Sequence, residues 1–81
     1  MSAAIDYRKL SSLGDRVKTG TATKQEKDEF MEMLYKNGSI TENQYQDYKT
    51  NQNIEELLKA GLAIGAVILI GHLLAEVFSS K

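Results

Sequence analysis

Few residues of this chain could do chemistry, and the most suggestive pair lies near its C-terminal end. His72 is the only histidine among 81 residues, and Glu76 follows it by four positions. Side chains four apart on a helix are neighbours, so this pair could relay a proton or act as a pH switch. We favour the alternative, a structural histidine that hydrogen-bonds to Glu76 or to a neighbouring helix. A single histidine without further ligands predicts no metal site.

The remaining polar residues predict neither catalysis nor cofactor binding. Acidic residues and lysines alternate at helical spacings between positions 24 and 36, which is typical of a solvated helix surface. The sequence shows no Ser, His and Asp arrangement and no phosphate-binding loop. The absence of cysteine excludes disulfides, and a net charge of −1 without a basic cluster argues against nucleic-acid binding. We therefore expect a non-enzymatic protein without a cofactor.

A long apolar segment surrounds the histidine. Of the 21 charged residues, 19 lie in residues 1–59. Residues 57–78 contain only three polar side chains, and as a helix they would reach about 33 Å, enough for a hydrocarbon core of about 30 Å. We predict one transmembrane helix over residues 54–78, followed by a short tail at 79–81. The alternative is the central helix of a small soluble bundle.

Small and polar residues gather on one face of this predicted helix. At about 100° per residue, one stripe contains Gly61, Gly65, Ile68, His72 and Glu76. Glycines four apart let two helix backbones approach closely, and a polar group facing lipid is costly. We therefore predict that this stripe packs against protein, while the opposite face, with Ala63 and Val67, tolerates lipid.

Capping signals organise the rest of the chain into helices. Thr23, Thr41 and Asn53 are each followed three residues later by Glu or Gln, the pattern of a capping box. The sequence predicts helices over about 2–18, 24–36 and 42–49. Gly38 provides a left-handed turn between the last two of these helices. The predicted fold class is all-α: a soluble helical head of residues 1–52 and one C-terminal membrane helix.

Apolar and aromatic residues of the predicted head recur at helical spacing. We expect five of them to serve as core or interaction anchors: Phe30, Leu34, Ile40, Tyr45 and Tyr48. Ile40 precedes the cap at Thr41, and Tyr45 lies at the fourth helical position. This spacing predicts a hydrophobic staple, which fixes the direction in which the chain enters the helix.

The hairpin around Gly38 resembles a known module. Six residues follow the pattern Leu-x3-Gly-x-Ile-Thr-x3-aromatic-x3-Lys in order: Leu34, Gly38, Ile40, Thr41, Tyr45 and Lys49. This is the pattern of SHOCT, the short C-terminal domain, and the resemblance covers about residues 30–50. Gln44 stands where the family usually has an acidic residue, and the paired leucines after the lysine are missing. The resemblance implies an interaction module of the kind found at the ends of bacterial proteins, often membrane-associated ones.

These features predict a tail-anchored membrane protein without an N-terminal signal. Lys49 and Lys59 on the head side, against Lys81 beyond the span, favour a head in the cytoplasm or its topological equivalent.

The leading hypothesis is a structural or adaptor protein. Its anchor would lie in a bilayer, while its helix and head bind a protein partner or a second copy. One setting is a minor membrane protein of a phage virion that links an internal membrane to the capsid. The alternatives are a holin-like or small pore-forming protein and a regulatory subunit of a membrane enzyme.

Overall fold

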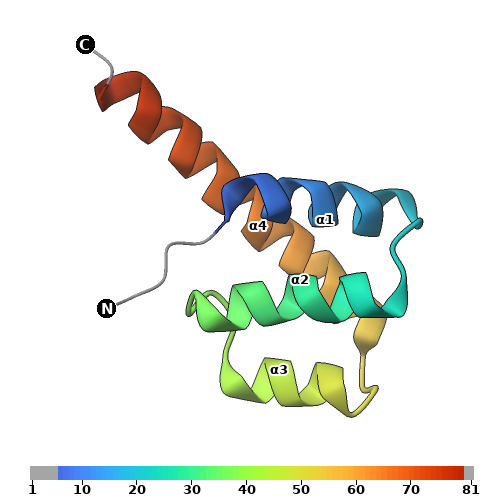
Figure 1. Ribbon diagram of the computed structural model, residues 1–81. Helices are drawn as coiled ribbons and strands as arrows, with labels where there is room; N and C mark the ends of the chain where they lie inside the picture. Colours follow the sequence, from blue (N-terminus) through green and yellow to red (C-terminus); the bar gives the residue numbers. More distant parts are fainter. Residues whose placement is uncertain (1–5, 80–81) are drawn as a thin grey trace.

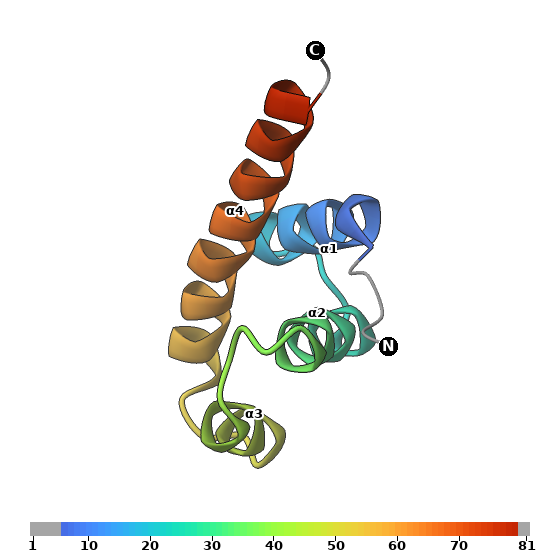
Figure 2. The ribbon, with the colours of Figure 1, turned by 90° about the vertical axis from the view of Figure 1, so that its left-hand side faces the viewer.

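The computed structural model describes residues 6–79, which form four helices and, within that range, no strand. In chain order they are α1 (Tyr7–Thr19), α2 (Lys24–Lys36), α3 (Glu42–Lys49) and α4 (Ile54–Ser79). Figures 1 and 2 show α4 beginning near α3, running past α2 and α1, and projecting beyond them. The predicted all-α fold class is confirmed, and α4 is long and apolar enough to cross a membrane. The predicted helical residues 2–5 and the end of the predicted tail, 80–81, lie outside the described residues.

Two threonines begin helices as their spacing predicts. The Thr23 hydroxyl accepts a hydrogen bond from the Glu26 N–H at 3.1 Å, and the Glu26 carboxylate accepts one from the Thr23 N–H at 2.9 Å. Thr41 and Gln44 make the same reciprocal pair at 3.1 and 2.8 Å. Each box satisfies N–H groups that the first turn of a helix leaves without partners. Local side-chain chemistry therefore fixes where α2 and α3 begin.

Gly38 lies in the turn between α2 and α3. Gly38 has a φ of 77°, in the left-handed region that other residues rarely adopt. Its N–H donates to the Tyr35 carbonyl, and the Ser39 N–H donates to the Leu34 carbonyl, both at 2.9 Å. These two bonds satisfy carbonyls at the end of α2 and reverse the chain toward α3. The left-handed turn predicted at Gly38 is confirmed.

The connection into α4 has a different geometry. Asn53 has a φ of 53°, whereas Thr23 and Thr41 are extended, with φ of −74° and −79°. The Asn53 carbonyl still accepts the Leu57 N–H at 2.9 Å, so Asn53 does begin α4. Asn51, two residues earlier, is also left-handed, with a φ of 63°. Asparagine tolerates this region better than most residues, and the helix thus begins from a left-handed turn rather than from an extended capping box.

The buried core draws side chains from all four helices and from the loop before α3. Its members are Leu10 and Leu13 of α1, Phe30, Met31 and Leu34 of α2, Ile40, Tyr48 of α3 and Leu58 of α4. The first half of α4 is thus one wall of the head. The core therefore crosses the boundary between head and membrane helix that the sequence predicts after residue 52.

Candidate functional site

The inner face of α4 packs closely on α2. Gly61 and Gly65 are both buried. A Cβ atom built at Gly61 would come within 3.1 to 3.2 Å of three side chains: Leu34, Met31 and Phe30. At Gly65 the nearest atom would be Cζ of Phe30, at 3.6 Å. A Cβ at position 61 would require these side chains to shift by a few tenths of an ångström, so this part of the stripe packs tightly within the chain.

The other half of the stripe leads from the core to the free end of α4. Ile68 is partly buried against the core. The His72 ring stacks on the Tyr7 ring of α1, with centroids 3.8 Å apart and planes inclined by 10°. His72 Nε2 lies 3.6 Å from Glu76 Oε2, and the His72 side chain is 31% exposed. The structure thus brings His72 and Glu76 together, and it places both beyond the buried core.

Tyr7 is the residue of this cluster that the sequence did not single out. It lies three positions before Leu10 on the same face of α1, and that spacing is the sequence signal by which Tyr7 could be found. Protonated His72 can form a charged pair with Glu76, while Tyr7 covers one face of its ring. Within residues 6–79 no group of three or more His, Cys, Asp and Glu residues could hold a metal ion.

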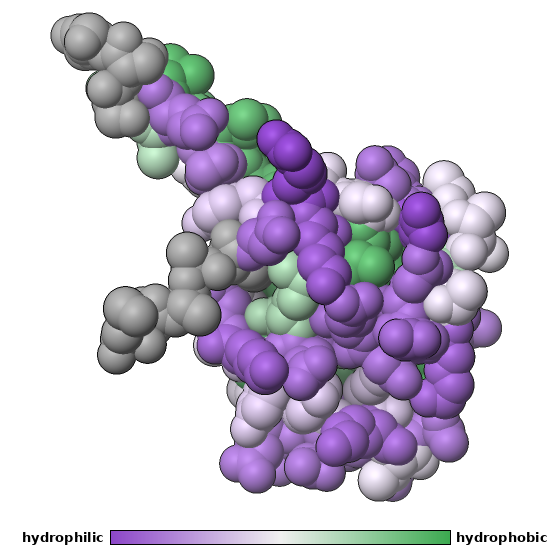
Figure 3. Space-filling view, viewed as in Figure 1, coloured by the Kyte–Doolittle hydropathy of each residue, from purple (hydrophilic) through white to green (hydrophobic). Residues whose placement is uncertain are grey.

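The outer face of α4 changes from charged to apolar along its length. Near its start, Glu55, Glu56 and Lys59 are exposed. Further along, six large apolar side chains are more than half exposed: Val67, Ile70, Leu73, Leu74, Val77 and Phe78, between 51% and 74%. Figure 3 shows this end of α4 projecting from a mainly hydrophilic face of the head, with hydrophobic residues along one side of the projection. The largest exposed apolar surface of the described chain therefore lies on one helix end.

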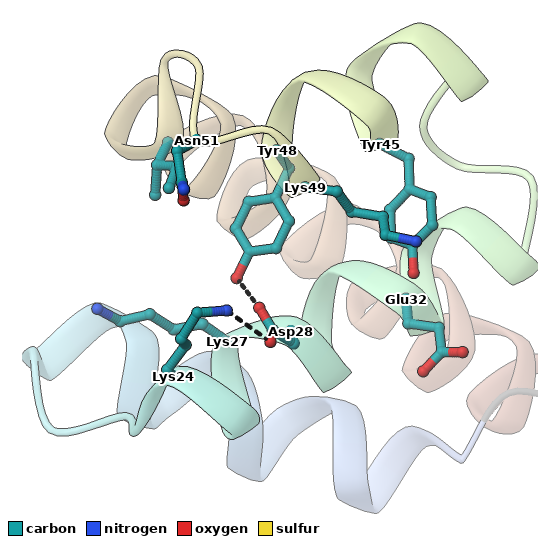
Figure 4. Close-up of a pocket in the computed structure, with 9 residues that line it drawn as sticks. Lys24, Lys27, Asp28, Glu32, Tyr45, Tyr48, Lys49 and Asn51 are labelled. Carbon is teal, nitrogen blue, oxygen red and sulfur yellow. Dashed lines mark hydrogen bonds and ion pairs between the residues drawn. The ribbon is translucent and has the colours of Figure 1, made fainter.

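A second surface feature is an open pocket of about 420 Å³ between α2, α3 and the start of α4. At its base the Tyr48 hydroxyl donates to Asp28 Oδ1 at 2.6 Å, and Lys24 Nζ donates to Asp28 Oδ2 at 3.0 Å (Figure 4). The Tyr48 hydrogen bond holds the pKa of Asp28 below its usual range. Burial, followed by the same hydrogen bond, raises the pKa of Tyr48. These groups satisfy one another, so the contact joins α2 to α3.

The five predicted head anchors differ in how accessible they are. Phe30, Leu34, Ile40 and Tyr48 are buried. Tyr45 is half-buried; its ring stacks on Tyr35 of α2 with centroids 4.4 Å apart, and the Lys49 ammonium lies 5.3 Å from its centroid. In the arrangement seen here, four of the five therefore act in the core and only Tyr45 is open to a partner.

No family model, no curated protein and no solved structure matches the chain. The resemblance of the hairpin to SHOCT modules stays a prediction from six positions.

Proposed function

We propose that this chain is a non-enzymatic, membrane-anchored adaptor, with α4 in a lipid bilayer and the head bound to a protein partner. The observation that carries this proposal is the exposed apolar outer face of α4. Moving its six large side chains from water into hydrocarbon contributes roughly 1 kcal/mol each, because they are only partly exposed at the start. Contiguous apolar surface of this kind is rare on soluble monomers and marks membrane or protein contacts.

The position of the charges agrees with a spanning helix. On the outer face, the last charged residue before the apolar end is Lys59. From Lys59 to Phe78 the helix rises by about 28 Å, close to a hydrocarbon thickness of about 30 Å. A lysine at this depth can extend its ammonium group to the lipid headgroups. α4 would therefore enter the bilayer close to the point where it leaves α3.

The adaptor role is supported by the head. The face of the head seen in Figure 3 is mainly hydrophilic, and its hairpin resembles modules that mediate interaction. A cytoplasmic or equivalent orientation of the head, and a place between an internal membrane and the capsid of a phage virion, are finer hypotheses within this proposal.

Flotation of the full chain with phosphatidylcholine vesicles tests the anchor. The natural chain should float with the vesicles and resist alkaline carbonate. The double variant Ile70→Asp with Leu74→Asp should stay at the bottom of the gradient, because two carboxylates would have to enter hydrocarbon. Both residues lie on the outer face, so circular dichroism should show an unchanged helix content.

A matched control and two outcomes complete this test. Ser12→Asp, on the exposed surface of α1, should float like the natural chain. A natural chain that remains soluble and monomeric beside the vesicles would contradict the anchor. Release of a dye trapped in the vesicles, at protein levels that float quantitatively, would favour the pore-forming alternative over the adaptor.

A further inference from the structure

The head, folded as it is here, leaves too little of α4 to cross a bilayer. Leu58, Gly61 and Gly65 are buried in the head, and Tyr7 of α1 covers His72. Residues 73–79, which follow His72, make up about 10 Å of helix, whereas the hydrocarbon core is about 30 Å thick. A spanning α4 therefore requires either that the head enters the hydrocarbon or that α4 leaves the head.

Charged groups on α1 and α2 oppose the entry of the head into the hydrocarbon. α1 lies beside α4 and is paired to α2 through two ion pairs on the head surface, Lys9 with Glu29 and Arg16 with Glu26. If α1 entered the bilayer with α4, these charged groups would lose their contact with water, which is strongly unfavourable in hydrocarbon. α1 and α2 also pack directly against each other, and this contact does not involve α4.

We infer that α4 separates from α1 and α2 when it spans the bilayer, and that the face it uncovers is a docking surface for a partner's helix. This inference rests on the proposed membrane anchor. The uncovered surface consists of Leu10, Leu13, Phe30, Met31 and Leu34, which are between 0% and 6% exposed while α4 covers them. In water, an exposed apolar surface of this kind marks a site that another protein segment covers.

The shape of the surface defines that occupant. α2 approaches α4 at two glycines four residues apart, and three of its side chains would lie within 3.2 Å of a Cβ at Gly61. A replacement helix must likewise present small residues at positions i and i+4 within an apolar face, as in other complexes with a helix in a groove. In the inserted state the α4 of every copy lies in the bilayer, so the occupant belongs to another protein.

The α3–α4 connection is where the separation would occur. Residues 50–53 join the two helices, and Asn51 and Asn53 are both in the left-handed region. Even asparagine, which tolerates this region better than most residues, stays there only while its surroundings hold it. A small change of backbone angles at these two asparagines would redirect α4 without breaking either helix.

Maleimide labelling of single cysteines tests the separation, because the chain itself contains none. Met31→Cys places a thiol in the covered face. It should label at least about tenfold more slowly than Ser12→Cys in solution, and at a similar rate once phosphatidylcholine vesicles bind the chain. Val67→Cys, exposed on the outer face of α4, should change in the opposite direction. Leu13→Cys repeats the test should Met31→Cys destabilise the head.

The labelling separates this inference from the anchor on which it rests. A chain that floats with vesicles while Met31→Cys stays protected would overturn the separation of α4 and leave the anchor standing. A chain that does not float would contradict the anchor itself.

A synthetic peptide of residues 54–66 serves as the docking probe, since it carries the inner face of the first half of α4. Energy transfer should show the peptide bound to the vesicle-inserted chain and not to bare vesicles. A peptide with leucine in place of both Gly61 and Gly65 should bind at least about tenfold more weakly, because it overpacks the contact. Equal binding of both peptides, or no binding of either, would overturn the docking surface.

Discussion

The two halves of α4 contain the same kinds of residue in opposite surroundings. Leu58 in the first half is 8% exposed, whereas Leu73 in the second half is 60% exposed. Gly61 lies against three side chains of α2, whereas a Cβ at Gly71 would meet nothing within 4 Å. An apolar stretch of helix can therefore be buried either by protein or by lipid. The packing of the other helices decides which of the two covers it.

Substitutions at the two phenylalanines of the chain should differ most in their effect on the free energy of unfolding. Phe30 is 1% exposed and Phe78 is 74% exposed. Phe30→Ala should lower the free energy of unfolding by about 3–5 kcal/mol, because it empties the centre of the core. Phe78→Ala should leave that free energy unchanged and weaken binding to vesicles. Urea unfolding followed by circular dichroism, together with flotation, measures both effects.

Equal losses of stability for these two variants would mean that the end of α4 is buried in the folded chain. That result would break the division of α4 into a covered half and an exposed half.

Larger side chains on the two faces of the same turn of α4 should differ next most in their effect on stability. Gly61→Leu should lower the free energy of unfolding by about 1–3 kcal/mol, since α2 has no room to accept the side chain. Ala63→Leu, on the exposed side, should change it by no more than about 0.5 kcal/mol. A reversed order in chemical denaturation would show that the inner face of α4 is the open one.

Substitutions at two further glycines should change the stability of the chain in opposite directions. Gly38→Val should destabilise the chain by about 1–2 kcal/mol, because a β-branched residue is strained at a φ of 77°. Gly71→Ala should raise helix stability by up to about 1 kcal/mol, because position 71 is an open site inside α4. Thermal unfolding measures both, and an unchanged midpoint for Gly38→Val would contradict the left-handed turn.

The smallest effect concerns the contact between α2 and α3. Tyr48→Phe removes the hydrogen bond to Asp28 and should cost about 1 kcal/mol, because the carboxylate is partly exposed. The folded pKa of Asp28 lies below its ordinary value of about 3.9. The hydrogen bond therefore contributes its full stability at pH values above the ordinary pKa of Asp28. This stability is lost as the pH falls through the folded pKa.

Unfolding measured from pH 7 to pH 2 should show this loss in the natural chain, and a smaller loss in Tyr48→Phe. The same pH dependence in both chains would mean that Tyr48 does not hold the Asp28 carboxylate.

The features that the sequence predicted well are those set by neighbouring residues. The capping boxes at Thr23 and Thr41 and the turn at Gly38 depend on positions within four residues, so their patterns indicate them directly. The sequence also placed Gly61, Gly65 and His72 on one face of a helix. It did not say which helix lies opposite, because α2 and a second membrane helix would demand the same small residues. The stacking of Tyr7 on His72 joins residues 65 positions apart, and no local pattern encodes it.

A single tryptophan at the end of α4 tests the membrane anchor most directly. The chain contains no tryptophan, so Phe78→Trp gives a unique reporter at the most exposed of the large apolar side chains. With phosphatidylcholine vesicles, its emission should shift to shorter wavelength and be quenched by lipids brominated along the acyl chains. Emission that stays at the wavelength of a water-exposed indole, with no quenching by those lipids, would contradict the account.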